Sequence, residues 1–396
     1  MVTIFSKPCD LTFSLLTSNI RTIDINAPTH NTLPMSTQAL LKQLYATPEQ
    51  DILKNIRSLR AELGDKVLIL GHHYQREEVF VFADVSGDSL KLSQQAADAD
   101  ASNIIFCGVH FMAETADILT SDAQAVFLPD LAAGCSMADM ANDMQVKQCW
   151  KELAEVIHPE TSVTPVTYIN STAALKAFCG EHGGIVCTSS NAQKVLEWSW
   201  DNRQKILFFP DQHLGENTAL AMGIPENQMI IWDPFKPLGG NSPEAIEQAT
   251  LILWKGFCSV HQLFKAEHAV TMRKNHSGIE ILAHPECSRE VCETADFVGS
   301  TEAIIKYVEA AEAGAKFAIA TELNLVNRLR ILHPEKPTWF LSPMVCMCST
   351  MFRTDPQHLY ATLLAIRDGD TSNQIIVPHA QKRWAKVALE RMLNLV

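Results

Sequence analysis

The feature that most limits the fold of this chain is a pattern that recurs three times between residues 67 and 319. Short, continuous apolar runs each end in polar residues, and helix-length segments separate the runs. Such runs are typical of parallel strands that are buried on both faces of a sheet. They are Val67–Leu70, Asn103–Cys107, Ala125–Leu128, Val163–Val166, Gly184–Cys187, Lys205–Phe209, Ile279–Leu282, Asp296–Val298 and Lys316–Ile319. The pattern therefore predicts an α/β fold of three similar units, each a small parallel sheet with helices on both faces.

We expect these units to be three domains that follow one another along the chain. Their expected ranges are 46–148, 149–265 and 266–396, and the last ends in a C-terminal helix. Residues 1–45 show no sustained period, so we expect them to form an N-terminal extension that lies on the surface.

Composition excludes several classes of protein. The 396 residues include 45 acidic and 32 basic side chains, and the formal net charge of −13 argues against nucleic acid as a partner. No uncharged apolar stretch approaches the roughly 18 residues that a membrane helix needs. The apolar patch Leu11–Leu16 is too short for a secretory signal. We therefore expect a soluble, cytoplasmic protein whose eleven cysteines are buried or bind metal rather than form disulfides.

Polar residues gather where the predicted strands end, and ligands bind at the carboxyl ends of strands in open parallel sheets. They are His72, His73 and Tyr74 in the first unit, Tyr168, Asn170 and Ser189 in the second, and His284, Glu286, Ser300 and Thr301 in the third. If these ends point at a common centre, one site receives groups from all three units. The hydroxyls are equally typical of helix N-caps, and a histidine is more often structural than catalytic.

One cysteine of each unit lies in a loop after the core strands, namely Cys135, Cys258 and Cys348. Three such thiols could meet at a pseudo-threefold axis, although the paired spacing that is the stronger sign of a metal site is absent. A zinc ion and an iron–sulfur cluster would then be the two candidate occupants of the site. A cubane cluster with three thiolate ligands leaves one iron open to act as a Lewis acid.

His284 and Glu286 are two residues apart at a strand end, and residues two apart in an extended segment face the same way. A carboxylate beside a histidine is a plausible general acid–base pair.

A series of ordered motifs resembles the quinolinate synthase family from about residue 50 to the C-terminus. These motifs are Gly-His-His-Tyr-Gln75, Gly-Asp-Ser-Leu90, Gly-Val-His-Phe-Met-Ala-Glu-Thr-Ala116, Thr-Tyr-Ile-Asn170, Cys-Thr-Ser-Ser-Asn-Ala192, Pro-Asp-Gln-His-Leu-Gly215, Phe-Cys-Ser-Val-His261, Ala-His-Pro-Glu-Cys287 and Gly-Ser-Thr-Glu302. The resemblance implies three domains in a pseudo-threefold arrangement around a central site, with a 4Fe–4S cluster held by Cys135, Cys258 and Cys348. Cys346 competes for the last position, but Cys348-Ser-Thr-Met351 resembles the family's Cys-x-x-Met string.

The resemblance also implies a reaction. Iminoaspartate condenses with dihydroxyacetone phosphate and loses phosphate and two waters to give quinolinate, the pyridine precursor in NAD biosynthesis. Glu286 would be the general acid–base group, Tyr74 would position or relay a proton, and His72 would take part in catalysis. The substrate-binding residues would be His72, Ser89, Tyr168, Asn170, Ser189, His284, Glu286 and Thr301. The enzyme that oxidises aspartate to iminoaspartate is a candidate partner.

Two other classes of function stay open from the residues alone. One is a non-catalytic iron–sulfur sensor, which the lack of a basic DNA-binding patch disfavours. The other is a small-anion binding protein without a cluster, which would be colourless and free of iron.

Overall fold

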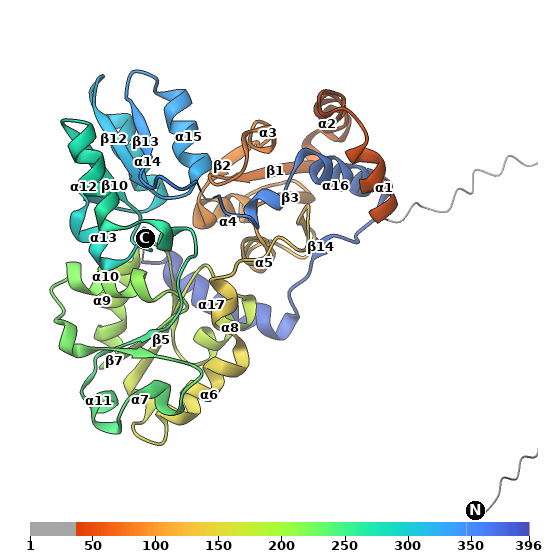
Figure 1. Cartoon of the computed structure of the whole chain (residues 1–396). Coiled ribbons are helices and arrows are strands. Elements are labelled where there is room, and N and C mark those ends of the chain that lie inside the picture. The colour runs from red at the N-terminus through yellow and green to blue at the C-terminus, as the bar shows by residue number, and fades with distance from the viewer. Residues whose placement is uncertain (1–36, 346, 396) are drawn as a thin grey trace, which may run out of the picture.

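The computed structural model describes residues 37–345 and 347–395. These residues form three sheets, which surround a common centre in Figure 1. Neighbouring strands are parallel in all three sheets, apart from the antiparallel pair of β14 and β4. The predicted α/β class with three parallel sheets is therefore confirmed.

The first sheet has the strand order β14-β4-β3-β1-β2. Its strands are β1 (Val67–His72), β2 (Val85–Gly87), β3 (Asn103–Cys107), β4 (Ala125–Phe127) and β14 (Gln374–Ile375). Its helices are α1 (Thr37–Tyr45), α2 (Glu49–Leu63), α3 (Glu77–Phe80), α4 (Ser89–Ala97), α5 (His110–Leu119) and α16 (Pro356–Asp368). Helices α2 and α16 share one apolar core with β1 and β3, and α4 and α5 share another. Because both faces of the sheet are covered, its central strands β1 and β3 are apolar apart from His72 and Asn103 at their ends.

The second sheet has the strand order β6-β5-β7-β9-β8. Its strands are β5 (Val163–Tyr168), β6 (Ile185–Cys187), β7 (Lys205–Phe209), β8 (Met229–Trp232) and β9 (Leu251–Trp254). Its helices are α6 (Asp143–Leu153), α7 (Pro159–Ser162), α8 (Ala173–Glu181), α9 (Ala192–Asn202), α10 (Gln212–Ala221), α11 (Pro243–Gln248) and α17 (His379–Leu393). Helix α17 packs against α8 and β6.

The third sheet has the strand order β11-β10-β12-β13. Its strands are β10 (Ile279–Ala283), β11 (Phe297–Val298), β12 (Lys316–Ala320) and β13 (Thr338–Phe340). Its helices are α12 (Ala266–Asn275), α13 (Arg289–Thr294), α14 (Thr301–Ala310) and α15 (Leu323–Leu332). Helices α12 and α13 share one core with the sheet, and α14 and α15 share the other.

The chain ends differ from the expected domain ranges. Only part of the expected third domain builds the third sheet, because β14 pairs with β4 of the first sheet and α17 lies on the second. Helix α16 returns to the first sheet, where the buried Leu359 and Leu363 join the core that α2 lines. At the other end, residues 37–45 of the expected extension form α1, which packs on α16, and the Tyr45 hydroxyl donates to Asp355 over 2.6 Å.

None of the helices in the described residues is both long and apolar enough to span a bilayer.

Candidate active site

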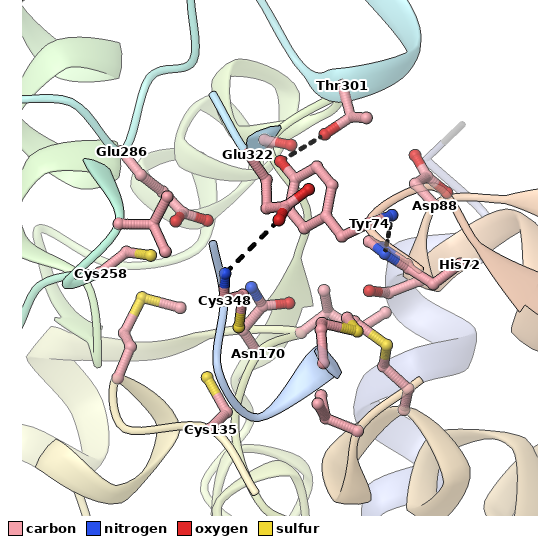
Figure 2. Close-up of a pocket in the computed structure, with 18 of the residues that line it drawn as sticks. His72, Tyr74, Asp88, Cys135, Asn170, Cys258, Glu286, Thr301, Glu322 and Cys348 are labelled. Atoms are coloured by element: carbon pink, nitrogen blue, oxygen red, sulfur yellow. Dashed lines mark hydrogen bonds between the residues drawn. The ribbon is translucent and has the colours of Figure 1, made fainter. Parts of the chain in front are cut away.

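One pocket lies where the three units meet, and the carboxyl ends of strands from all three sheets open into it (Figure 2). Each residue of the predicted site lines this pocket: His72, Tyr74, Ser89, Cys135, Tyr168, Asn170, Ser189, Cys258, His284, Glu286, Thr301 and Cys348. Two other residues singled out from the sequence point elsewhere. Ser300 accepts the Ala303 N–H as the N-cap of α14, and the His73 ring pairs with Glu302 over 3.2 Å.

The three cysteines occupy the same local structure in their three units. Each precedes a short 3-10 turn by three residues, and these turns are Ala138–Met140, His261–Leu263 and Met351–Arg353. In each case the cysteine carbonyl accepts the N–H of the fourth residue along, over 3.0–3.1 Å. A serine also follows each of these cysteines, whereas Met347 follows Cys346. This Cys-Ser repeat is a sequence signal that favours Cys348, while Cys346 lies outside the described residues.

The donor set fits a cluster with three thiolate ligands. Figure 2 shows the three sulfurs on one side of the pocket and His72 and Tyr74 on the other. Backbone N–H groups of Met137 and Ala138 reach the Cys135 thiol, and hydrogen bonds of this kind are common at cluster sulfurs. Burial raises the pKa of Cys135 to about 12, so a bound cation is what would make the thiolate favourable. No fourth cysteine is among the described residues that line the pocket.

A second grouping of metal-binding side chains overlaps the three thiols. Cys258, His261 and Glu286 each offer a ligand atom, and these atoms lie within 4.8 Å of one another. Such a set would suit a single zinc ion with one open position. The pocket therefore contains two possible donor sets that share Cys258.

His72 and His284 are held in the same way, and the backbone fixes which ring nitrogen carries the proton. The Tyr74 N–H donates to His72 Nδ1 over 3.1 Å, and the Glu286 N–H donates to His284 Nδ1 over 3.3 Å. Burial lowers the pKa of His72 well below its usual value and that of His284 to about 3. Both rings are therefore neutral near pH 7, with Nδ1 as acceptor and the Nε2 proton left to donate.

Glu286 is a buried carboxylate with polar neighbours on several sides. Burial alone would raise its pKa, but nearby His261 and a hydrogen bond from Tyr168 outweigh that effect and lower it. His261 Nδ1 lies 2.9 Å from Glu286 Oε2 but off the line of a ring N–H hydrogen bond, so this contact is mainly electrostatic. Glu286 is thus ionised at neutral pH and able to accept a proton.

Tyr74 crosses from the first unit to the third. Its hydroxyl lies 2.9 Å from both Thr301 Oγ1 and Thr321 Oγ1. Burial raises its pKa above the usual range, so the hydroxyl keeps its proton and can donate it. The edge of its ring meets His72 at a centroid distance of 4.9 Å.

The predicted site left out several polar residues that line the pocket, among them His261, Asp88 and Glu322. His261 lies beside Glu286, and Asp88 N-caps α4 by accepting the Lys91 N–H. Glu322 caps α15 and accepts the Cys348 N–H over 3.4 Å, a bond drawn in Figure 2. Burial raises the pKa of Glu322 to about 7. The position of each, directly after a strand or a ligand-bearing turn, is the signal that could have identified them.

Comparison with known proteins gives consistent results. The family model described as quinolinate synthetase A protein matches residues 54–394. Quinolinate synthase from Rhodopirellula baltica is 56% identical over 362 residues, which span 88% of this chain and 92% of that protein. Quinolinate synthase from Corynebacterium glutamicum is 50% identical over 360 residues, 91% of each chain. The one from Acidobacterium capsulatum is 51% identical over 357 residues, 90% of this chain and 96% of its own.

Among solved structures, the apo-structure of D-lactate dehydrogenase from Escherichia coli aligns with 86% of this chain and 96% of its own. The TM-score is 0.19 at 10% identity, a likeness too weak to bear on fold or function.

Proposed function

Because the chain belongs to the quinolinate synthetase A protein family and is thus an enzyme, we propose that it condenses iminoaspartate with dihydroxyacetone phosphate to form quinolinate. The reaction releases one phosphate and two waters, so it needs proton donors, a proton acceptor and a site for the phosphate. The observation that carries this proposal is a single pocket, reached by all three units, that brings three thiols together with acid–base groups.

We propose that a 4Fe–4S cluster is held by Cys135, Cys258 and Cys348. When bound, it would supply one iron without a protein ligand, and that iron would act as a Lewis acid toward a substrate oxygen. The repeated turn that follows each cysteine supports this ligand set, because it gives one thiol from each unit the same local geometry.

Other polar residues of the pocket would bind and orient the substrates. His72 and His284 can each donate an Nε2 proton to a carboxylate or carbonyl oxygen of the substrate. Tyr168 and Asn170 also line the pocket from the end of β5. Neutral donors of this kind hold an anion without themselves needing a counter-charge.

The phosphate would bind near Ser89, Ser189 and Thr301. Ser89 and Thr301 are the first residues of α4 and α14, and helix N-termini favour anions through their free N–H groups. Three hydroxyls that line one pocket add further donors.

Proton transfer would be shared between Glu286 and Tyr74. As a carboxylate, Glu286 would accept the proton that leaves a substrate carbon during condensation or dehydration. The Tyr74 hydroxyl would donate toward an oxygen that leaves as water. In these roles Glu286 is the general base and Tyr74 relays the proton.

The test is an anaerobic assay with iminoaspartate generated in place and dihydroxyacetone phosphate added. We expect quinolinate and phosphate to appear in equal amounts, and neither to appear when either substrate is left out. Phosphate release without quinolinate would show that the pocket hydrolyses the phosphate ester instead, and the proposed condensation would be wrong.

We also propose that the enzyme acts in the cytoplasm and contacts the enzyme that oxidises aspartate to iminoaspartate. Free iminoaspartate hydrolyses in water. Direct transfer between the two enzymes would therefore raise the fraction of iminoaspartate that is converted to quinolinate. Covalent cross-linking of the two purified proteins checks this contact, and the absence of a joint product at micromolar concentrations would argue against it.

A further inference from the structure

The loop that carries Tyr74 is held by a helix of another unit. Residues His73, Tyr74 and Gln75 follow β1 of the first sheet, and their three consecutive carbonyls all accept hydrogen bonds from α15 of the third. Arg328 Nη1 donates to His73 O and Nη2 donates to Gln75 O, each over 2.8 Å. Asn324 Nδ2 donates to Tyr74 O over 3.2 Å.

Arg328 is held firmly enough to act as a template for this loop. Only 8% of its surface is exposed, and its guanidinium carbon lies 3.4 Å from the centroid of the Phe80 ring. Its Nε donates to Glu77 over 3.1 Å. Because a guanidinium is a planar fork with five N–H donors, it can bind two separated carbonyls and a carboxylate at once, whereas a lysine ammonium cannot reproduce that spacing.

The geometry points to Arg328 as a positioning residue for Tyr74. By fixing the carbonyls on both sides of Tyr74, Arg328 sets the place of the ring whose hydroxyl contacts Thr301 and Thr321. Both threonines belong to the same unit as Arg328, so one unit holds the backbone and the hydroxyl of a residue that the other unit contributes. The catalytic consequence of this contact rests on the proposed function, while the structural consequence does not.

The position of Tyr74 can be followed without any assay of turnover. The chain has five tyrosines, so protein labelled with 3-fluorotyrosine gives a simple ¹⁹F NMR spectrum, in which Tyr74→Phe identifies the Tyr74 signal. In Arg328→Lys we expect that signal to shift or broaden while those of Tyr307 and Tyr360 stay in place. The matched control is Arg330→Lys, since Arg330 is exposed on the same helix and bonds only Asn327 among the described residues. The control should move no signal.

A second variant guards against loss of folding. Asn324→Ala removes the bond to Tyr74 O without leaving a charge or cutting the other two carbonyl contacts, so it should shift the same signal by less. A Tyr74 signal that is unchanged in both Arg328→Lys and Asn324→Ala would overturn the inference.

Kinetics separate a positioning role from a merely structural one. We expect Arg328→Lys to lower kcat on the order of 10- to 100-fold, as displacement of a catalytic group does, with a smaller change in KM. In a Tyr74→Phe background the same change should cost less than about threefold, because the group that Arg328 positions is already lost. Fully multiplicative effects of the two changes would contradict the role. If the unaltered enzyme makes no quinolinate, the proposed function fails while the NMR result still decides the role of Arg328.

Discussion

Backbone hydrogen bonds fix which ring nitrogen carries the proton in two histidines of the pocket. The N–H of the residue two positions on fixes the tautomer of both His72 and His284, so each ring presents an Nε2 proton. The sequence suggested that His284 and Glu286 form an acid–base pair. The structure instead pairs Glu286 more closely with His261, because the turn after Cys258 brings that ring to 2.9 Å.

Glu286→Gln should keep the fold and the metal content but lose most turnover. The amide has nearly the same shape and cannot take a proton near neutral pH, and losing a general acid–base group costs on the order of 10²–10⁴-fold. The measurement is kcat for quinolinate formation, with circular dichroism to check folding. Glu290→Gln is the matched control, because Glu290 is exposed just four residues away. Activity within a few-fold of the unaltered enzyme would give Glu286 a structural role.

Cys348→Ala should lose iron, whereas Cys346→Ala should retain it. The Cys-Ser pair and the turn at Met351–Arg353 make Cys348 the counterpart of Cys135 and Cys258. Iron per chain, measured after anaerobic purification, separates the two variants. The reverse pattern, with iron kept in Cys348→Ala and lost in Cys346→Ala, would move the third ligand to Cys346.

At the scale of elements, apolar runs predicted the central strands well and the chain ends poorly. All nine expected runs form strands, because strands that are buried on both faces of a sheet must be apolar. The apolar runs Met229–Trp232 and Leu251–Trp254 also form strands, β8 and β9, and were not among the expected runs. Strands β2, β13 and β14 also have no counterpart among the expected runs, and β14 is paired only through contacts distant in sequence. The return of α16 and α17 to earlier sheets depends on which apolar faces remain uncovered, and local periodicity does not encode that.

Helix α8 gives a prediction about stability and pH. Lys176 is fully buried, with its Nζ bonded to the Ser171 carbonyl and 5.7 Å from the centroid of the Phe111 ring. Burial lowers its pKa from 10.5 to about 8. Between those pH values the unfolded chain holds this proton and the folded chain does not, so the contribution of Lys176 to stability rises with pH across the window.

Below pH 8 the cost of burying the charge is fully present. Lys176→Met should remove this pH dependence. The unfolding free energy of the unaltered protein minus that of Lys176→Met should therefore rise by up to about 3 kcal/mol from pH 8 to 10.5. Denaturant titrations at several pH values measure the difference, and Lys194→Met on the exposed face of α9 is the control. A difference that stays flat across the window would mean that the folded chain keeps the Lys176 proton there, so that burial does not lower the pKa of Lys176.

For the whole molecule, both the site and part of the apolar core are shared between units. Most apolar clusters belong to one sheet, but the cluster of the second sheet also includes Leu90 and Ile118 of the first unit, and the pocket depends on loops from all three units. The sequence could predict many of the residues that line this pocket, since strand ends carry them. It could not predict the contacts between units, such as Arg328 with the Tyr74 loop, because those depend on how the sheets are placed around the pocket.

Exposure to air should abolish turnover before it unfolds the chain. A cluster with three protein ligands has one exposed iron that oxidation removes easily, whereas the apolar cores do not depend on it. We expect far-UV circular dichroism to persist after the colour is bleached, and iron, sulfide and thiol to restore activity. Unfolding in step with bleaching would show that the cluster also holds the three units together.

The measurement that most directly tests the proposed cluster and its role in turnover is the iron, sulfide and zinc content of anaerobically purified protein. Quinolinate formation is followed in the same samples. We predict about four iron and about four sulfide per chain, and turnover in proportion to iron across samples of different loading. Quinolinate formation by iron-free protein would contradict the role of the cluster. So would a single zinc ion that is lost in His261→Ala, because it would place the metal on Cys258, His261 and Glu286 instead of the three thiols.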